Sequence, residues 1–192
     1  MTERSLFESV LGGRFAGLAP ALQRFHRLSG RHVLEGVVET EPPATALGRA
    51  LAWCLGTPRR AMTGPIRFEL DAAPAIETWT RCFPARTMRS RMELVDGRVV
   101  ERMGPARLTF ALDEVDGRLR MRLERMRFCG IPCPAWLRPR LLAEETGEGD
   151  RLHFHIEAAV PVIGRVVGYR GWLRVPGDDT RVTGTDSHDP RG

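Results

Sequence analysis

Two histidines and a glutamate alternate along His153-Phe154-His155-Ile156-Glu157, the sharpest candidate for metal chemistry in the chain. On a β-strand, side chains point alternately to opposite faces, so His153, His155 and Glu157 share one face. Two imidazoles and a carboxylate on one face form a plausible zinc site. The apolar residues between them equally indicate an ordinary strand with one buried and one wet face. We favour the second interpretation, predict no metal or other cofactor, and expect both histidines to face solvent.

A second segment, Trp79-Thr80-Arg81-Cys82-Phe83, places Arg81 between two aromatic side chains on one face of a predicted strand. If that face is internal, the buried guanidinium needs a carboxylate or a bound anion as its partner. If the face is external, the pattern is ordinary packing of arginine on aromatic rings. The sequence leaves both alternatives open, and Trp79 and Arg81 become candidate ligand-binding residues.

A third segment, Tyr169-Arg170-Gly171-Trp172, pairs Tyr169 with Gly171 on one face and Arg170 with Trp172 on the other. Glycine in a strand lets a ligand or a neighbouring strand approach closely. Arg170 is suited to an anionic group, with Trp172 beside it as an apolar wall. Strand packing at the surface is the alternative. We predict that Trp79, Arg81, Tyr169 and Arg170 all lie on the concave side of the sheet or at its mouth.

Residues for proton transfer are scattered rather than gathered in a motif. His26 ends a predicted helix, where a capping role is more common than that of a general base. An enzyme would use Arg81, Arg102 or Arg170 to hold an anionic substrate and His26, Glu101 or Tyr169 to move a proton. The chain contains no nucleophile elbow, phosphate-binding loop, dinucleotide fingerprint or His-Glu-x-x-His motif. The sequence therefore assigns no catalytic residue.

Composition excludes several classes of function. All 29 basic residues are arginine, the net charge is +5, and the arginines are spread over nearly every predicted strand. That distribution argues against nucleic-acid binding, which favours basic clusters with stacking aromatics. No apolar run approaches the ~20 residues of a membrane span, so we expect no integral membrane contact. The N-terminus lacks an apolar signal segment, and a cytoplasmic protein is expected. Its four cysteines are then expected to be reduced, small buried side chains.

Hydrophobic periodicity predicts a mainly β fold. Helical patterns occur near residues 5–12, 20–28 and 44–55, and strands run from 32 to 175. Asp96-Gly97 and Asp116-Gly117 are typical of tight hairpin turns, and the apolar phase slips near 124–125, which predicts a β-bulge. We expect a strongly curved antiparallel sheet or barrel of eight to ten strands, with N-terminal helices packed on it. Residues 1–176 would form one domain and 177–192 a disordered tail.

Five segments, in this order and spacing, resemble the bacterial domain-of-unknown-function family DUF4166 over about residues 5–175. They are 18–26, 79–83, Glu101-Arg102-Met103-Gly104-Pro105, Gly130-Ile131-Pro132-Cys133-Pro134 and 169–172. The resemblance implies a stand-alone copy of a module that also occurs behind oxidoreductase domains. It carries no catalytic residue onto this chain. An oxidoreductase encoded nearby is therefore an expected partner.

The sequence supports two hypotheses about function. A long curved sheet commonly encloses a cavity for one small ligand, and five methionines on the predicted strands would give that cavity adaptable walls: Met88, Met92, Met103, Met121 and Met126. The leading hypothesis is a binding module for a small apolar or amphipathic molecule. The candidate site residues are Trp79, Arg81, Glu101, Arg102, Tyr169, Arg170 and Trp172. The alternative is an enzyme, or an accessory subunit of an oxidoreductase, acting on an anionic or lipid-like substrate.

Overall fold

The structure of the protein, a computed structural model, describes residues 4–177. All described strands belong to one antiparallel sheet. They are β1 (Gly30–Thr40), β2 (Met62–Ala73), β3 (Ile76–Phe83), β4 (Arg86–Val95), β5 (Arg98–Met103), β6 (Ala106–Val115), β7 (Arg118–Phe128), β8 (Ile131–Pro132), β9 (Arg140–Glu148), β10 (Arg151–Val160) and β11 (Gly164–Arg174). The helical elements are α1 (Leu6–Leu11), η1 (Gly12–Gly17), α2 (Pro20–His26), α3 (Ala46–Leu55) and η2 (Ala135–Leu137).

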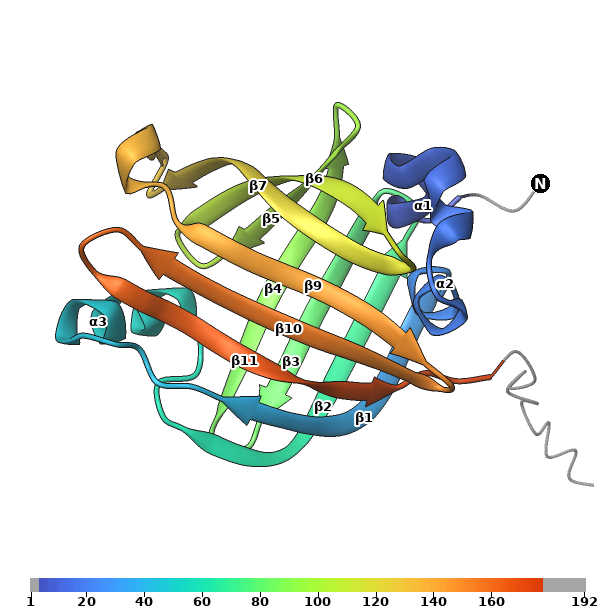
Figure 1. Ribbon diagram of the computed structural model, residues 1–192, viewed down its shortest axis with the longest axis horizontal. Coiled ribbons are helices and arrows are strands. Elements are labelled where there is room, and N and C mark those ends of the chain that lie inside the picture. Colours follow the sequence, from blue (N-terminus) through green and yellow to red (C-terminus); the bar gives the residue numbers. More distant parts are fainter. Residues whose placement is uncertain (1–3, 178–192) are drawn as a thin grey trace, which may run out of the picture.

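The sheet closes on itself. Its strand order is β6-β5-β4-β3-β2-β1-β11-β10-β9-β7, and β6 also pairs with β7, so ten strands form a ring (Figure 1). The two-residue β8 pairs only with β7 and extends the ring locally. This closed barrel confirms the prediction of a strongly curved antiparallel sheet with N-terminal helices. Closure pairs most strand edges of the described sheet, which protects the barrel against edge-to-edge association.

Turn chemistry explains why neighbouring strands form hairpins. Asp96 and Gly97 have φ values of 50° and 69°, and Asp116 and Gly117 have 51° and 80°. Two consecutive positive φ angles match the right-handed twist of paired strands, and Asp-Gly adopts them readily. The expected bulge is also present, because Thr109 pairs with Arg125 while Phe110 pairs with Leu123. Glu124 is the extra residue, and it bends β7 where the barrel curves.

At one place in the ring, the seam between β7 and β9, two neighbouring strands are hydrogen-bonded along only part of their length. Strands β7 and β9 pair only at Leu119–Glu145 and Arg120–Glu144. Beyond these pairs the two strands diverge, and the distant part of β7 pairs with β8 instead. The backbone of 121–128 therefore lies apart from that of 140–143, and side chains rather than a hydrogen-bond ladder separate the interior from solvent there.

The two ends of the barrel are built differently (Figure 1). The end that carries α1, η1 and α2, together with the turns that follow β2, β4, β6 and β9, is called the plugged end. The end that carries α3, η2 and the turns that follow β3, β5 and β10 is called the open end. The N-terminal helical segment attaches to the plugged end by hydrogen bonds from Ala19 N–H to the Gly117 carbonyl and from Arg24 Nη2 to the Gly149 carbonyl, each at 2.9 Å.

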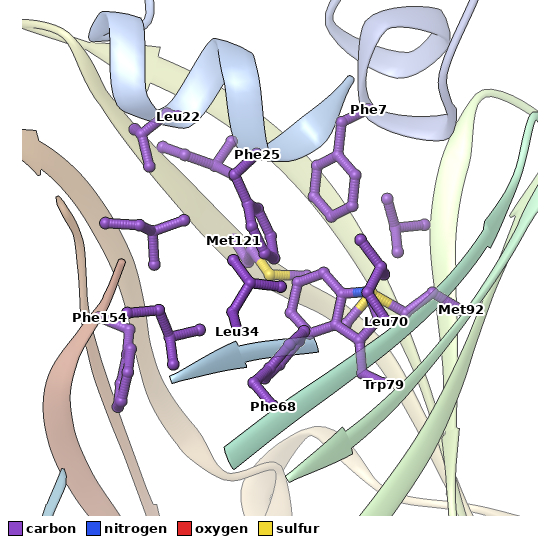
Figure 2. Close-up of a cluster of buried hydrophobic side chains, with 14 of the residues drawn as sticks. Phe7, Leu22, Phe25, Leu34, Phe68, Leu70, Trp79, Met92, Met121 and Phe154 are labelled. Atoms are coloured by element: carbon purple, nitrogen blue, oxygen red, sulfur yellow. The ribbon is translucent and has the colours of Figure 1, made fainter. Parts of the chain in front are cut away.

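Aromatic side chains form the core beneath those helices. Figure 2 shows Phe7 and Phe25 descending from the helices onto Trp79 and Phe68 of the barrel wall. The ring centroids of Phe25 and Trp79 lie 5.8 Å apart and nearly perpendicular, and those of Phe68 and Trp79 lie 5.4 Å apart. Such edge-to-face pairs stabilise a core beyond simple area burial. A capping box between Ser5 and Glu8 fixes the start of the first helix.

Across residues 4–177, no helix is long and apolar enough to cross a bilayer. The predicted disordered tail, residues 177–192, lies outside the described residues except for Gly177.

Gly36 of β1 and Gly171 of β11 allow these two strands to approach closely. Gly171 provides a test of the fold. A Cβ atom on Gly171 would overlap the Val37 carbonyl oxygen and lie 2.8 Å from Phe154 Cζ. We expect Gly171→Ala to lower the free energy of unfolding by about 3 kcal/mol, because a backbone atom cannot move aside as a side chain can. Urea denaturation measures this. Gly13→Ala, which meets nothing within 4 Å, is the matched control, and an equal loss there would contradict the prediction.

Candidate functional site

The barrel encloses a cavity of about 100 Å³ between the aromatic core and the open end. Its walls are mostly apolar. All five methionines that the sequence suggested for adaptable walls line it: Met88, Met92, Met103, Met121 and Met126. Period-two alternation along β4 through β7 points these side chains inward, while the arginines between them point outward. The cavity is thus an unfilled apolar space with flexible methionine walls, rather than a fully packed core.

Arg81 is the one buried arginine among the described residues. Its side chain comes from β3 and is only 7% exposed. The guanidinium lies 4.9 Å from the Trp79 ring centroid and 5.7 Å from that of Phe68, and Nη1 donates a hydrogen bond to Ser90 Oγ at 3.0 Å. Within residues 4–177 no carboxylate forms an ion pair with it. A buried guanidinium with one neutral hydrogen bond keeps most of its donors available to a ligand.

Tyr169 and Glu101 face the same space from opposite walls, β11 and β5. Both are buried. Burial raises the pKa of Tyr169, and the nearby Glu101 and Glu145 add to the increase while Arg81 opposes it. The phenol therefore stays protonated and can donate a hydrogen bond. Among the described residues its hydroxyl has no hydrogen-bond partner, so Arg81 and Tyr169 both present free donors.

A second polar group lies where the cavity meets the helical plug. His26 Nε2 lies 2.8 Å from Glu145 Oε2, and both side chains are buried. Trp79 Nε1 donates to Glu77 Oε2 at 2.7 Å. Burial raises the pKa of Glu77 to about 7, although His26 and the Trp79 hydrogen bond counteract the shift. His26 Nδ1 is buried without a partner among the described residues. The preferred capping role of His26 is therefore wrong, since its ring points into the barrel.

The cavity reaches solvent at the divergence of β7 and β9. Leu123 and Met126 line it from one strand, and Pro139 and Leu141 line it from the other. Arg138 bridges the two sides, because its Nη1 donates to the Glu124 carbonyl oxygen at 3.0 Å. The paired part of this seam also carries ion pairs of Arg118 and Arg120 with Glu144, each at 2.8 Å, so it is the part beyond Arg120 that lacks a hydrogen-bond ladder.

Three candidate residues lie outside the barrel, which corrects the expectation that Arg170 faces the concave side. Arg170 is exposed and forms an ion pair with Glu39 at 2.9 Å. Arg102 pairs with Glu93 at 3.5 Å. Trp172 lies on the outer wall beneath Arg151, whose Cζ is 4.2 Å from the ring centroid. Because Tyr169 and Arg170 are consecutive in one strand, they point to opposite faces, and only Tyr169 lies inside.

The histidines and cysteines also lie away from the cavity. His153 and His155 are on the outer wall, and His155 is exposed. In the part of the chain that the structure describes, no three His, Cys, Asp or Glu residues are grouped so that they could hold a metal ion. All four cysteines are free, but none is buried, so their predicted role as buried apolar side chains is wrong. Cys129 occupies a turn with φ 50°, and Cys54 lies on the exposed side of α3.

Sequence reasoning missed three of the internal polar residues: Glu77, Ser90 and Glu145. A signal for the first two was present, because Glu77 shares the period-two face of Trp79 and Arg81, and Ser90 that of Met88 and Met92. Glu145 similarly alternates with Ala143. What the sequence could not supply is the contact of Glu145 with His26, which are 119 positions apart in the chain.

Comparison with known proteins places the chain in a family. The family model described as "Domain of unknown function (DUF4166)" matches residues 18–173, and the chain belongs to that family. No curated protein matches the chain in sequence. Among solved structures, the crystal structure of Rv2717c from M. tuberculosis is similar, with 12% identity and a TM-score of 0.47 over 83% of this chain and 99% of that one.

The buried Glu77 predicts a pH dependence of stability. The unfolded carboxyl ionises near 4.5 and the folded one near 7, so the folded state holds its proton over a range in which the unfolded state has lost it. Stability should therefore fall as pH rises from 4.5 to 7 and then level off. Glu77→Gln removes this contribution. Relative to the unsubstituted protein, it should gain about 3 kcal/mol in the free energy of unfolding between pH 4.5 and 8.

Urea denaturation at several pH values measures the difference. Glu35→Gln, at an exposed position on the outer wall, is the matched control and should follow the unsubstituted protein at every pH. A constant difference between Glu77→Gln and the unsubstituted protein across that range would show that Glu77 is ionised throughout.

Proposed function

We propose that this member of the DUF4166 family binds a small amphipathic molecule inside its barrel, with an oxygen-bearing head group at Arg81 and Tyr169. The observation that carries the proposal is the buried Arg81, which faces an apolar cavity without an ion-pair partner among the described residues. A desolvated guanidinium is costly when it lacks a counter-charge or further hydrogen-bond acceptors. A bound carboxyl or carbonyl group would supply them.

The neighbouring groups define what such a head group must offer. Arg81 and the protonated Tyr169 are donors, so the ligand must present acceptor oxygens. Glu101 lies buried on the facing wall and is an acceptor, so a ligand with an additional hydroxyl or acid proton gains a further hydrogen bond. Glu145 is already occupied by His26. A carboxylic acid or a hydroxyl-bearing carbonyl compound fits this arrangement.

The methionine walls suit the apolar part of that ligand. At about 100 Å³, the cavity is smaller than the ~150 Å³ that holds benzene in an engineered apolar cavity. A longer tail must displace side chains or leave through the β7–β9 divergence. Unbranched methionine side chains change rotamer at low cost, and Leu123, Met126 and Leu141 continue the apolar surface to the outside. Both routes accommodate a flexible hydrocarbon chain.

The test uses the neutral fluorescent probe N-phenyl-1-naphthylamine and its displacement by dodecanoic acid. The unsubstituted protein should bind the probe, and the acid should displace it. Arg81→Met should weaken the acid about tenfold, because a hydrogen bond to a charged group contributes roughly 1.5 kcal/mol or more. Arg170→Met is the matched control on the outer wall and should leave displacement unchanged.

Ala143→Phe provides an independent check, since a ring at this cavity-lining position should block probe binding. Ala73→Phe, exposed at the plugged end, should not. If the unsubstituted protein binds no probe, or if both arginine variants weaken the acid equally, the proposed binding site is wrong.

A second candidate function is catalysis on the same ligand, as an enzyme or an accessory subunit of an oxidoreductase. The observation in its favour is that Arg81, Glu101 and Tyr169 share the cavity and the His26–Glu145 pair adjoins it. Mass spectrometry of the ligand recovered after incubation separates the two functions. An unchanged ligand supports the binding module. A converted ligand, with conversion lost in Tyr169→Phe or Glu101→Gln but not in Arg170→Met, supports the enzyme.

A further inference from the structure

The up-and-down topology sorts the charges of the chain between the two ends of the barrel. At the open end, the connecting segments hold eleven arginines and only one carboxylate, Glu41; these segments are 41–62, 83–87, 102–107, 125–140 and 160–165. At the plugged end, the connections between strands (71–78, 93–99, 113–119 and 147–152) hold nine carboxylates and three arginines, and residues 4–31, which include the N-terminal helices, add one carboxylate and five arginines. The open end therefore carries a large excess of positive charge, whereas the charges of the plugged end nearly balance.

Most arginines at the open end also lack an ion-pair partner among the described residues. Among the described residues, only Arg102 and Arg165 of that end form ion pairs, with Glu93 and Glu41. The remaining nine have none. Four of them, Arg49, Arg59, Arg60 and Arg86, surround a groove of about 330 Å³ that contains no carboxylate. Elsewhere, most arginines of the barrel walls and of the plugged end are neutralised, as in the pair of Arg118 with Glu144 at 2.8 Å. The unmatched positive charge is thus confined to one end.

Apolar side chains project from the same end. The most exposed large apolar residues of the described chain are Val162 at 99%, Trp136 at 72%, Ile131 at 70% and Trp53 at 61%. They come from the β10–β11 turn, η2, β8 and α3, which all lie at the open end in Figure 1. Large apolar side chains that gather at one exposed end of a protein indicate a surface suited to contact with a membrane or another molecule.

We propose that the open end docks on an anionic lipid bilayer. Four exposed apolar side chains enter the headgroup region: Trp53, Ile131, Trp136 and Val162. The surrounding arginines contact lipid phosphates. Tryptophan and arginine are the residues that favour this interface. The plugged end has no such excess of arginine, so this charge asymmetry orients the barrel with its open end toward the lipid.

This proposal rests on the proposed function only where it concerns ligand entry, because docking would bring the mouth of the ligand cavity to the bilayer. Leu123, Met126 and Leu141 line that mouth, between β8 and η2 on one side and the β10–β11 turn on the other. An amphipathic ligand dissolved in the bilayer would enter between β7 and β9 without its tail crossing water. Vesicle binding itself requires no ligand, so the two proposals can fail separately.

The test is co-sedimentation of the full chain with vesicles of phosphatidylglycerol and phosphatidylcholine in equal parts, against vesicles of phosphatidylcholine alone. We expect binding to the anionic vesicles that weakens with added salt. Arg59→Gln with Arg60→Gln should weaken it roughly fivefold for each arginine. Trp53→Ala with Trp136→Ala should weaken it roughly tenfold.

Matched controls come from the rest of the surface. Arg14→Gln with Arg31→Gln removes two exposed arginines from the plugged end, and Ile76→Ala removes an exposed apolar side chain there. None of these should weaken vesicle binding. Brominated lipids should quench Trp53 and Trp136 but not Trp172, because only the first two lie at the open end.

Three outcomes would overturn the proposal. One is equal binding to neutral and anionic vesicles, or no binding to either. Another is an equal loss from the plugged-end variants. The third is tight binding to soluble polyglutamate with no lipid quenching, which would assign the basic end to an acidic protein instead. Vesicle binding that survives in Ala143→Phe while the probe no longer binds would confirm that the two properties are separate.

Discussion

A ring of ten strands encloses more space than the side chains of its own walls fill, and the rest of the structure follows from that constraint. Eight strands leave an interior that side chains just occupy. Here the surplus is met at one end by Phe7, Phe25 and His26, which descend onto Trp79 from the N-terminal helices. Within residues 4–177, no equivalent group of side chains fills the other end, and a methionine-lined cavity remains there.

The same geometry explains why polar residues are tolerated inside. Trp79 packs against the aromatic plug and against Arg81, and its own indole N–H donates to Glu77. The polar residues therefore gather where the plug ends and the cavity begins. Strand alternation carries the arginines outward at most other positions, and the turns concentrate unpaired positive charge at the open end. The interior thus forms the proposed binding site, and the charge of the exterior gives the proposed direction of approach to it.

Much of the fold could be predicted because its determinants are local. Asp96-Gly97 and Asp116-Gly117 determine their own turns, and the phase slip at Glu124 marks the bulge. The side of the wall that each residue faces was harder to assign. Tyr169 and Arg170 were both expected inside, although adjacent strand residues diverge, and the ion pair with Glu39 shows which one lies outside. The His26–Glu145 contact depends on helix placement over a distant strand, which no local pattern encodes.

The central claim is that the methionine-lined interior is the ligand site, and methyl NMR of methionine-labelled protein tests it most directly. Dodecanoic acid is added to protein with 13C-methyl methionine. The account predicts that the signals of Met88, Met92, Met103, Met121 and Met126 shift together, and that Met62, which does not line the cavity, keeps its position. A shift of Met62 alone, or unchanged signals from all five cavity methionines at saturating acid, would contradict it.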